Sequence, residues 1–183
     1  MIYICLLRGV NVSGKNKVSM SNLKTELENN GYRNVCTYLN SGNVIFESHV
    51  TDNDKLCEDI KQIIFNKFQL NIPVFVLNYS ELTDLLDNRP NWLDLTDKNI
   101  YNNIIFLIRP TITKDVYDSL GKPTDAIEKI MEYNNFIYWS FDLKNYRKAN
   151  WWIKTASTNI KDKITIRTVN TISKLLELCK KIK

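Results

Sequence analysis

The sequence predicts an α+β fold built from two ferredoxin-like halves, each with the order β-α-β-β-α-β and an antiparallel sheet, closed by a C-terminal helix. Three observations support this fold class. The 183 residues alternate short apolar runs of strand length with segments whose apolar residues recur every three to four positions. The run Ile2–Leu7 is apolar at both parities, as in a central buried strand. The order of elements also repeats along the chain, although the two copies share few identical residues.

This repeat defines the expected domain organisation. The predicted boundaries are a first subdomain at residues 1–79, a short helix and connector at residues 80–102, and a second subdomain with the closing helix at residues 103–183.

Capping residues and turns mark the elements of the first half. Ser19 is a good helix N-cap, Val18 and Leu23 are spaced for a hydrophobic staple, and Gly31 is a typical helix stop. The turn residues Asn40–Asn43 between two short strands predict a β-hairpin. The predicted elements are a strand at Ile2–Leu7, a helix at about Met20–Asn30, strands at Asn34–Leu39 and Val44–Phe46, a long helix that opens at Thr51–Asp54 and reaches Phe68, and a strand at Ile72–Leu77.

The second half is expected to follow a short helix capped by Ser80 and a connector at Asn88–Asn102. Asp142 is predicted to cap a helix with one apolar side, made of Tyr146, Ala149, Ile153 and Ala156. The predicted elements are a strand at Ile104–Ile108, a helix at about Lys114–Leu120, strands at Ala126–Met131 and Phe136–Phe141, the helix after Asp142, a short strand at Ile164–Ile166, and a last helix after Thr168.

One segment, Arg8–Lys17, is glycine-rich, polar and basic, and it lies between the first strand and the first helix. In the predicted sheet, strand one lies between strands three and four, so this loop and the turn Ser41–Asn43 should meet at one end of the sheet. A helix N-terminus with nearby cations and glycines is suited to binding an anion. We expect a small anionic ligand to be bound there by Arg8, Gly9, Asn11, Gly14, Lys15, Ser41, Gly42 and Asn43. The alternative is that the two loops only buttress each other.

The segment Gly9–Asn16 also has the pattern Gly-x4-Gly-Lys-Asn, one residue from the nucleotide-binding P-loop. Asn16 lacks the hydroxyl that would hold Mg²⁺ in that motif. The predicted helix cap is Ser19 rather than the lysine, and the predicted sheet is antiparallel. These three features disfavour nucleotide hydrolysis of the P-loop type.

Two stretches carry a resemblance to a known family. The residues Leu7–Asn16 and Thr37–Phe46, with Met20 and Leu23 between them, closely resemble the bacterial family catalogued as domain of unknown function 1697. Thr165–Leu175 resembles the closing motif of that family, from which Thr168 and Val169 depart. The resemblance implies a small cytoplasmic ferredoxin-like protein, brings no established activity, and groups Arg167 and Thr171 with the opening loop as signature positions. Arg167 is therefore added to the predicted ligand-binding residues.

The charge distribution leaves a second function open. From Lys144 to Lys183 the chain has eleven Lys and Arg residues against Asp162 and Glu177. A nucleic-acid-binding protein is the alternative, since cations that alternate with aromatic rings can hold phosphates and stack bases. The residues concerned are Lys144, Arg147, Lys148, Trp151, Trp152 and Lys154. Because Trp151 and Trp152 are adjacent, at most one of them should face the core squarely.

Residues for catalysis and metal binding are few. The signature motifs contain no histidine, so an enzyme acting on a nucleotide or phosphate ester is a further, less favoured alternative. The four cysteines form no Cys-x-x-Cys pair and the only histidine is His49, which disfavours a metal site. No cofactor is expected. The sequence has no apolar run long enough for a membrane span and no predicted signal peptide, so a cytoplasmic protein without a membrane partner is expected.

Overall fold

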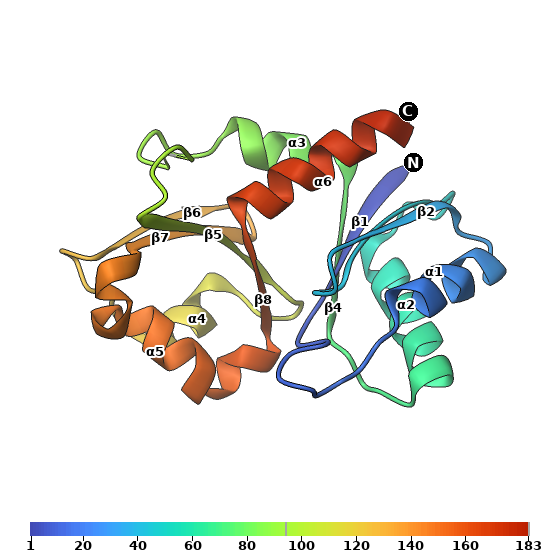
Figure 1. Cartoon of the computed structure of the whole chain (residues 1–183), viewed down its shortest axis with the longest axis horizontal. Coiled ribbons are helices and arrows are strands. Elements are labelled where there is room, and N and C mark those ends of the chain that lie inside the picture. Colours follow the sequence, from blue (N-terminus) through green and yellow to red (C-terminus); the bar gives the residue numbers. More distant parts are fainter. Residues whose placement is uncertain (94, 183) are drawn as a thin grey trace. The chain divides into compact units, whose positions relative to one another are not determined.

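The computed structural model describes residues 1–93 and 95–182, and its fold is α+β with two similar halves and a C-terminal helix, as predicted (Figure 1). The chain divides into two compact units. The first comprises Met1–Asp84 together with Lys174–Lys183, and the second comprises Leu85–Ser173.

The first half contains one four-stranded antiparallel sheet in the predicted order β2-β3-β1-β4. Its elements are β1 (Ile2–Leu7), α1 (Met20–Asn29), β2 (Arg33–Tyr38), β3 (Asn43–Glu47), α2 (Asn53–Phe68) and β4 (Val74–Asn78), followed by α3 (Tyr79–Asp87). Every residue of β1 is buried, as the apolar pattern predicted for a central strand.

Helices α1 and α2 cover one face of this sheet (Figure 1). Their apolar stripes, including Leu23 and Leu27 of α1 and Ile60 and Ile64 of α2, pack in one core with Tyr3 and Phe46. The predicted Ser19 cap is confirmed, since its hydroxyl accepts from the N–H of Asn22. Within the predicted opening Thr51–Asp54, the cap of α2 is Asp52, whose carboxylate accepts from the N–H groups of Asp54 and Lys55.

The second half contains a sheet of the corresponding order, β6-β7-β5-β8. Its elements are β5 (Ile100–Leu107), α4 (Thr113–Leu120), β6 (Glu128–Tyr133), β7 (Phe136–Asp142), a 3₁₀ helix η1 (Leu143–Lys148), α5 (Asn150–Ser157), a 3₁₀ turn η2 (Asn159–Asp162), β8 (Ile164–Thr168) and α6 (Val169–Ile182). Helices α4 and α5 pack against one face of the sheet through Val116, Leu120 and Trp151.

The single helix predicted after Asp142 is wrong, because the structure breaks it at Ala149. Asp142 does cap the segment, since its carboxylate accepts from the N–H of Lys144. That segment is the 3₁₀ helix η1, and the extended backbone of Ala149 then separates it from α5. Tyr146 and Ile153 consequently do not share one side of a helix.

Glu128 of β6 explains where α5 begins. Its buried carboxylate accepts hydrogen bonds from four N–H groups, those of Thr124, Asn150, Trp151 and the Trp139 indole, at 2.8–3.1 Å. Two of these donors are the first N–H groups of α5, whose N-cap residue Ala149 has no side chain able to cap. A carboxylate from another element therefore acts as the cap and compensates the helix dipole.

Each half contains the same backbone hydrogen bonds at corresponding positions, although the two halves have few identical side chains. The N–H of the last residue of the first strand donates to the hairpin turn in both halves, from Leu7 to Gly42 and from Leu107 to Asn135. The next N–H in each half donates to the residue before the last strand, from Arg8 to Pro73 and from Ile108 to Lys163, at 2.9 Å in both cases. Backbone groups are common to all residues, so the architecture can repeat without sequence identity.

Candidate anion-binding site

The opening loop, residues 8–19 between β1 and α1, lies against the β2–β3 turn, as the strand order predicted. The Leu7 N–H donates to the Gly42 carbonyl at 2.8 Å, and Asn11 Nδ2 donates to the Asn40 carbonyl at 2.9 Å. Gly42 is buried with φ +79°, and a Cβ there would lie 2.6 Å from the Leu7 Cβ. Only glycine fits this contact, because both the space and the backbone angle exclude a side chain.

A tight hairpin forms the tip of the opening loop. The Asn11 N–H donates to the Asn16 carbonyl at 3.1 Å, and the Lys15 N–H donates to the Val12 carbonyl at 2.9 Å. Ser13 and Gly14 between them have φ angles of 49° and 77°, as in a type I′ turn. The backbone after Lys15 therefore does not enter a helix, and α1 begins only at Met20. This geometry differs from the P-loop, in which the helix starts at the lysine.

The asparagines of the loop hold the backbone in place. Asn11 Oδ1 accepts from the Val18 N–H, while its Nδ2 donates to the carbonyls of Val18 and Asn40. Asn16 Nδ2 donates to the Gly9 carbonyl at 3.0 Å. Asn11 is among the predicted ligand-binding residues, and in the structure both its amide oxygen and its amide nitrogen bond the protein. Asn11 therefore determines the shape of the loop and ties it to the start of α1.

An asparagine side chain also holds the backbone of the β2–β3 turn. Asn43 is fully buried, and its Nδ2 donates to the Tyr38 carbonyl at 2.8 Å and to the Ser41 hydroxyl at 3.0 Å. Ser41 is exposed, and its hydroxyl accepts from Asn43.

The exposed cations of the loop are Lys15 and Lys17. Among residues 1–93 and 95–182 neither forms an ion pair, whereas Lys67 pairs with Glu26 at 2.7 Å on the same unit. The first turn of α1 carries no acidic residue. Arg8 at the base of the loop is half-buried, and its N–H donates to the Pro73 carbonyl. Positive charge and the positive end of a helix dipole are thus gathered on one loop and its helix.

The two signature positions near the C-terminus lie on β8 and α6. Arg167 is buried, and its Nη1 donates to the Thr165 hydroxyl and the Ile166 carbonyl, both at 2.9 Å. Thr171 lies in the first turn of α6: its N–H donates to the Thr168 hydroxyl, and the two hydroxyls lie 2.9 Å apart. Asn78 and Glu81 bond reciprocally at the start of α3, the corresponding position of the first half. Thr168, the residue before α6, therefore caps this helix, and Thr171 donates to that cap.

The basic–aromatic segment 144–154 is divided by the break at Ala149. Trp151 is fully buried and donates from Nε1 to the Gly121 carbonyl, whereas Trp152 is 41% exposed. The prediction that at most one of these rings faces the core is confirmed. Lys144, Arg147 and Lys148 are exposed on η1, and Lys154 is half-buried on α5.

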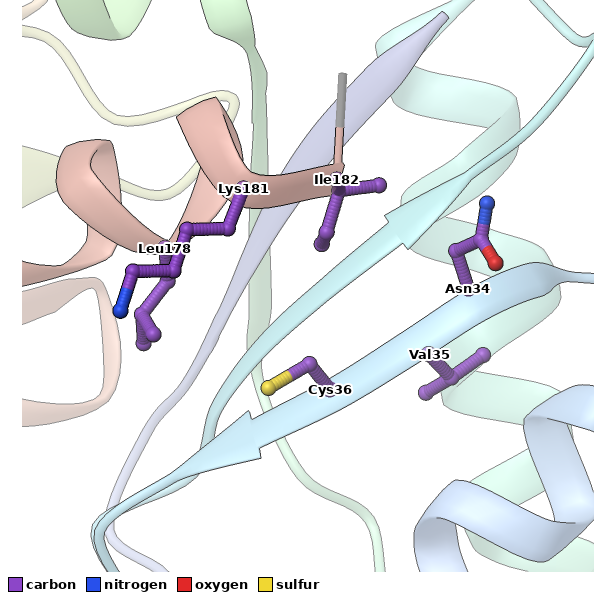
Figure 2. A pocket seen from close by; sticks show the side chains of 6 residues that line it. All are labelled: Asn34, Val35, Cys36, Leu178, Lys181 and Ile182. Atoms are coloured by element: carbon purple, nitrogen blue, oxygen red, sulfur yellow. The ribbon is translucent and has the colours of Figure 1, made fainter.

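A cavity that the sequence did not suggest lies beside the edge strand β2. It has a volume of about 410 Å³ and is lined by Asn34, Val35, Cys36, Leu178, Lys181 and Ile182. Figure 2 shows the Cys36 thiol on β2 facing the last turns of α6. Small-molecule sites commonly have volumes of this order. Sequence patterns could not reveal it, because only tertiary packing brings β2 and the end of α6 together.

The cysteines are thiols in different surroundings. Cys5 and Cys179 are buried, and Cys36 and Cys57 are half-buried. Burial raises the pKa of Cys57 to about 11 and, together with the Cys36 thiol, that of Cys179 to about 11. The described residues contain no group of three or more His, Cys, Asp or Glu side chains that could hold a metal ion. Nor does any helix in the described part of the chain have the length and apolar character needed to cross a membrane.

Comparison with known proteins agrees with the resemblance drawn from the opening loop and hairpin. A family described as a protein of unknown function, DUF1697, matches residues 1–138. Among solved structures, the chain is similar to the conserved bacterial protein SP0830 from Streptococcus pneumoniae, with 26% identity, a TM-score of 0.84, and coverage of 96% of this chain and 97% of that one. No curated protein matches the chain. Because the family match spans most of the sequence, the chain belongs to the DUF1697 family of proteins of unknown function.

Proposed function

We propose that the protein binds a small phosphate-bearing anion at the opening loop. The observation that carries this proposal is the pair of exposed lysines, Lys15 and Lys17, which form no ion pair within the described residues and precede a helix whose first turn has no acidic residue. An anion at this point would receive both ionic attraction and the helix dipole.

The predicted residues of the opening loop and the β2–β3 turn each have a role in the proposed site, and Lys17 joins them; Arg167 lies in the second unit and is given no role. Lys15, Lys17 and Arg8 supply positive charge, and Gly9 and Gly14 leave the backbone open to close approach, since a Cβ at Gly14 would meet no atom within 4 Å. Ser41 offers an exposed hydroxyl. Asn11, Gly42 and Asn43 act indirectly by fixing the two loops before the ligand arrives. A loop fixed in advance loses less conformational entropy on binding.

The test is calorimetric titration with inorganic phosphate, pyrophosphate and ATP, supported by thermal-shift measurements. The double variant Lys15→Ala/Lys17→Ala is compared with the wild type and with Lys55→Ala, which removes an exposed lysine elsewhere in the same unit. We expect the double variant to bind at least about tenfold more weakly, which corresponds to about 1.4 kcal/mol. Lys55→Ala should bind as the wild type does. If none of the three anions binds, or if the double variant binds them equally well, the proposal is wrong.

A further inference from the structure

An exposed aromatic–basic patch lies on η1 and α5, at some distance along the chain from the opening loop. We define this patch as Lys144, Tyr146, Arg147, Lys148 and Trp152, all of which are exposed. Tyr146 and Trp152 are 37% and 41% exposed, and the neighbouring Leu143 and Ile153 are also exposed. Large exposed side chains concentrated in one short segment are typical of interaction surfaces.

The two exposed rings are held in place before any partner binds. The ring centroids of Trp152 and Tyr146 lie 6.3 Å apart with their planes at 89°, and Trp152 makes a second edge contact with Tyr101 at 6.0 Å. Trp152 also lies 5.4 Å from Phe141 of the core. Its ring therefore packs against buried Phe141 and half-buried Tyr101 while part of it faces solvent. A fixed aromatic side chain binds with little loss of rotamer entropy.

Positive charge surrounds these rings. The Arg147 guanidinium lies 5.6 Å from the Tyr146 ring centroid, and its Nε donates to the Tyr146 hydroxyl at 2.9 Å. This contact uses one guanidinium N–H and orients the group, while its other donors remain available to an anion. Between residues 143 and 163 the chain has six Lys and Arg residues and one acidic residue, Asp162. The surface thus favours a polyanion.

We infer that the aromatic–basic patch binds single-stranded nucleic acid. Exposed rings can stack on unpaired bases, and the three cations can contact the intervening phosphates. The exposed rings favour a single strand over other polyanions. A duplex keeps its bases stacked on one another, and an acidic peptide would be attracted by the cations alone. The combination of Trp152 and Tyr146 with Arg147 fits a partner that alternates flat rings with charges.

The experiment measures fluorescence anisotropy of a labelled oligothymidylate and oligouridylate at several salt concentrations. Trp152→Leu removes the ring but keeps an apolar side chain of moderate size, and Trp152→Phe restores an aromatic ring at the same place. We expect Trp152→Leu to weaken binding by about 5- to 100-fold and Trp152→Phe to recover most of the affinity. Arg147→Ala/Lys148→Ala should reduce the slope of log affinity against log salt by about 1.4, because each single-strand phosphate contact contributes about 0.7.

Two further titrations test whether the patch binds other polyanions equally well. A duplex of the same sequence and an acidic glutamate-rich peptide are titrated in parallel, with circular dichroism to show that each variant is folded. Weaker binding of both competitors supports the inference. The inference is overturned if the single strands do not bind near physiological salt, if Trp152→Leu binds as the wild type, or if the acidic peptide binds equally well. Loss of binding only in Lys15→Ala/Lys17→Ala would also overturn it and would assign the nucleic acid to the opening loop.

Discussion

The side chain of Asn11 donates from Nδ2 to the carbonyl of Asn40, 29 residues away in the sequence and 2.9 Å away in space. The same amide group bonds the N–H and the carbonyl of Val18, so one side chain joins the loop after β1, the approach to α1 and the β2–β3 turn. The proposed anion site therefore depends on a residue that need not touch the anion.

We expect Asn11→Ala to lower the free energy of unfolding by about 1–3 kcal/mol, since it removes three partly exposed hydrogen bonds. Asn11 has a φ of 55°, so Asn11→Gly is the matched control that keeps this angle accessible. Urea denaturation should find both variants less stable than the wild type, with alanine the worse of the two. Wild-type stability for Asn11→Gly would mean that the backbone angle, and not the amide bonds, is what matters.

Two glycines with nearly the same backbone angle should respond differently to alanine. Gly42 and Gly14 have φ angles of 79° and 77°, but a Cβ at Gly42 would clash with Leu7 and Val10, whereas one at Gly14 would meet nothing within 4 Å. Gly14→Ala should cost only the left-handed strain of about 1–2 kcal/mol. Gly42→Ala adds the displacement of packed atoms and should cost at least about 1–3 kcal/mol more. Chemical denaturation of both variants measures the difference, and equal losses would contradict the packing argument.

Glu128→Gln should destabilise the second half, although glutamine has nearly the same size and shape as glutamate. The glutamine amide keeps one acceptor oxygen. Its NH₂ group would face N–H groups that donate to the carboxylate in the wild type, and these donors would lose their acceptor. We expect a loss of about 2–4 kcal/mol, because buried donors lose their charged acceptor. The control is Asp118→Asn, which breaks an exposed ion pair with Lys114 and should change stability by less than about 1 kcal/mol. Unfolding followed by tryptophan fluorescence is suitable, since Trp139 and Trp151 both bond Glu128.

The raised pKa of Cys57 predicts an alkaline loss of stability. The folded state holds the Cys57 proton up to about pH 11, while an exposed thiol loses it near its ordinary value of 9.0. Between these values the folded state binds more protons than the unfolded state, so stability falls as pH rises. Cys57→Ala should flatten this slope between pH 9 and 11 relative to the wild type, as measured by denaturation at each pH. Identical slopes would show that the Cys57 thiol does not contribute.

The sequence predicted the first half well because its elements are determined locally. Ser19 and Asp52 cap helices within their own segments, and the apolar run of β1 predicts its central place. The position of the opening loop beside the β2–β3 turn followed from strand order alone. The break at Ala149 could not be predicted in this way, since the carboxylate that starts α5 comes from Glu128 on β6. The cavity beside Cys36 is equally non-local, because α6 supplies half of its lining.

The corresponding backbone hydrogen bonds of the two halves also show where the two halves differ in the length of a connection. Both halves leave their first strand through the same pair of hydrogen bonds, at Leu7 and Arg8 and at Leu107 and Ile108. The first half then uses residues 8–19 to reach its helix, and the second half uses only residues 108–112. The opening loop is thus an insertion between fixed anchor points. The added length carries Lys15 and Lys17, so the two halves differ most in the connection that holds the proposed anion site.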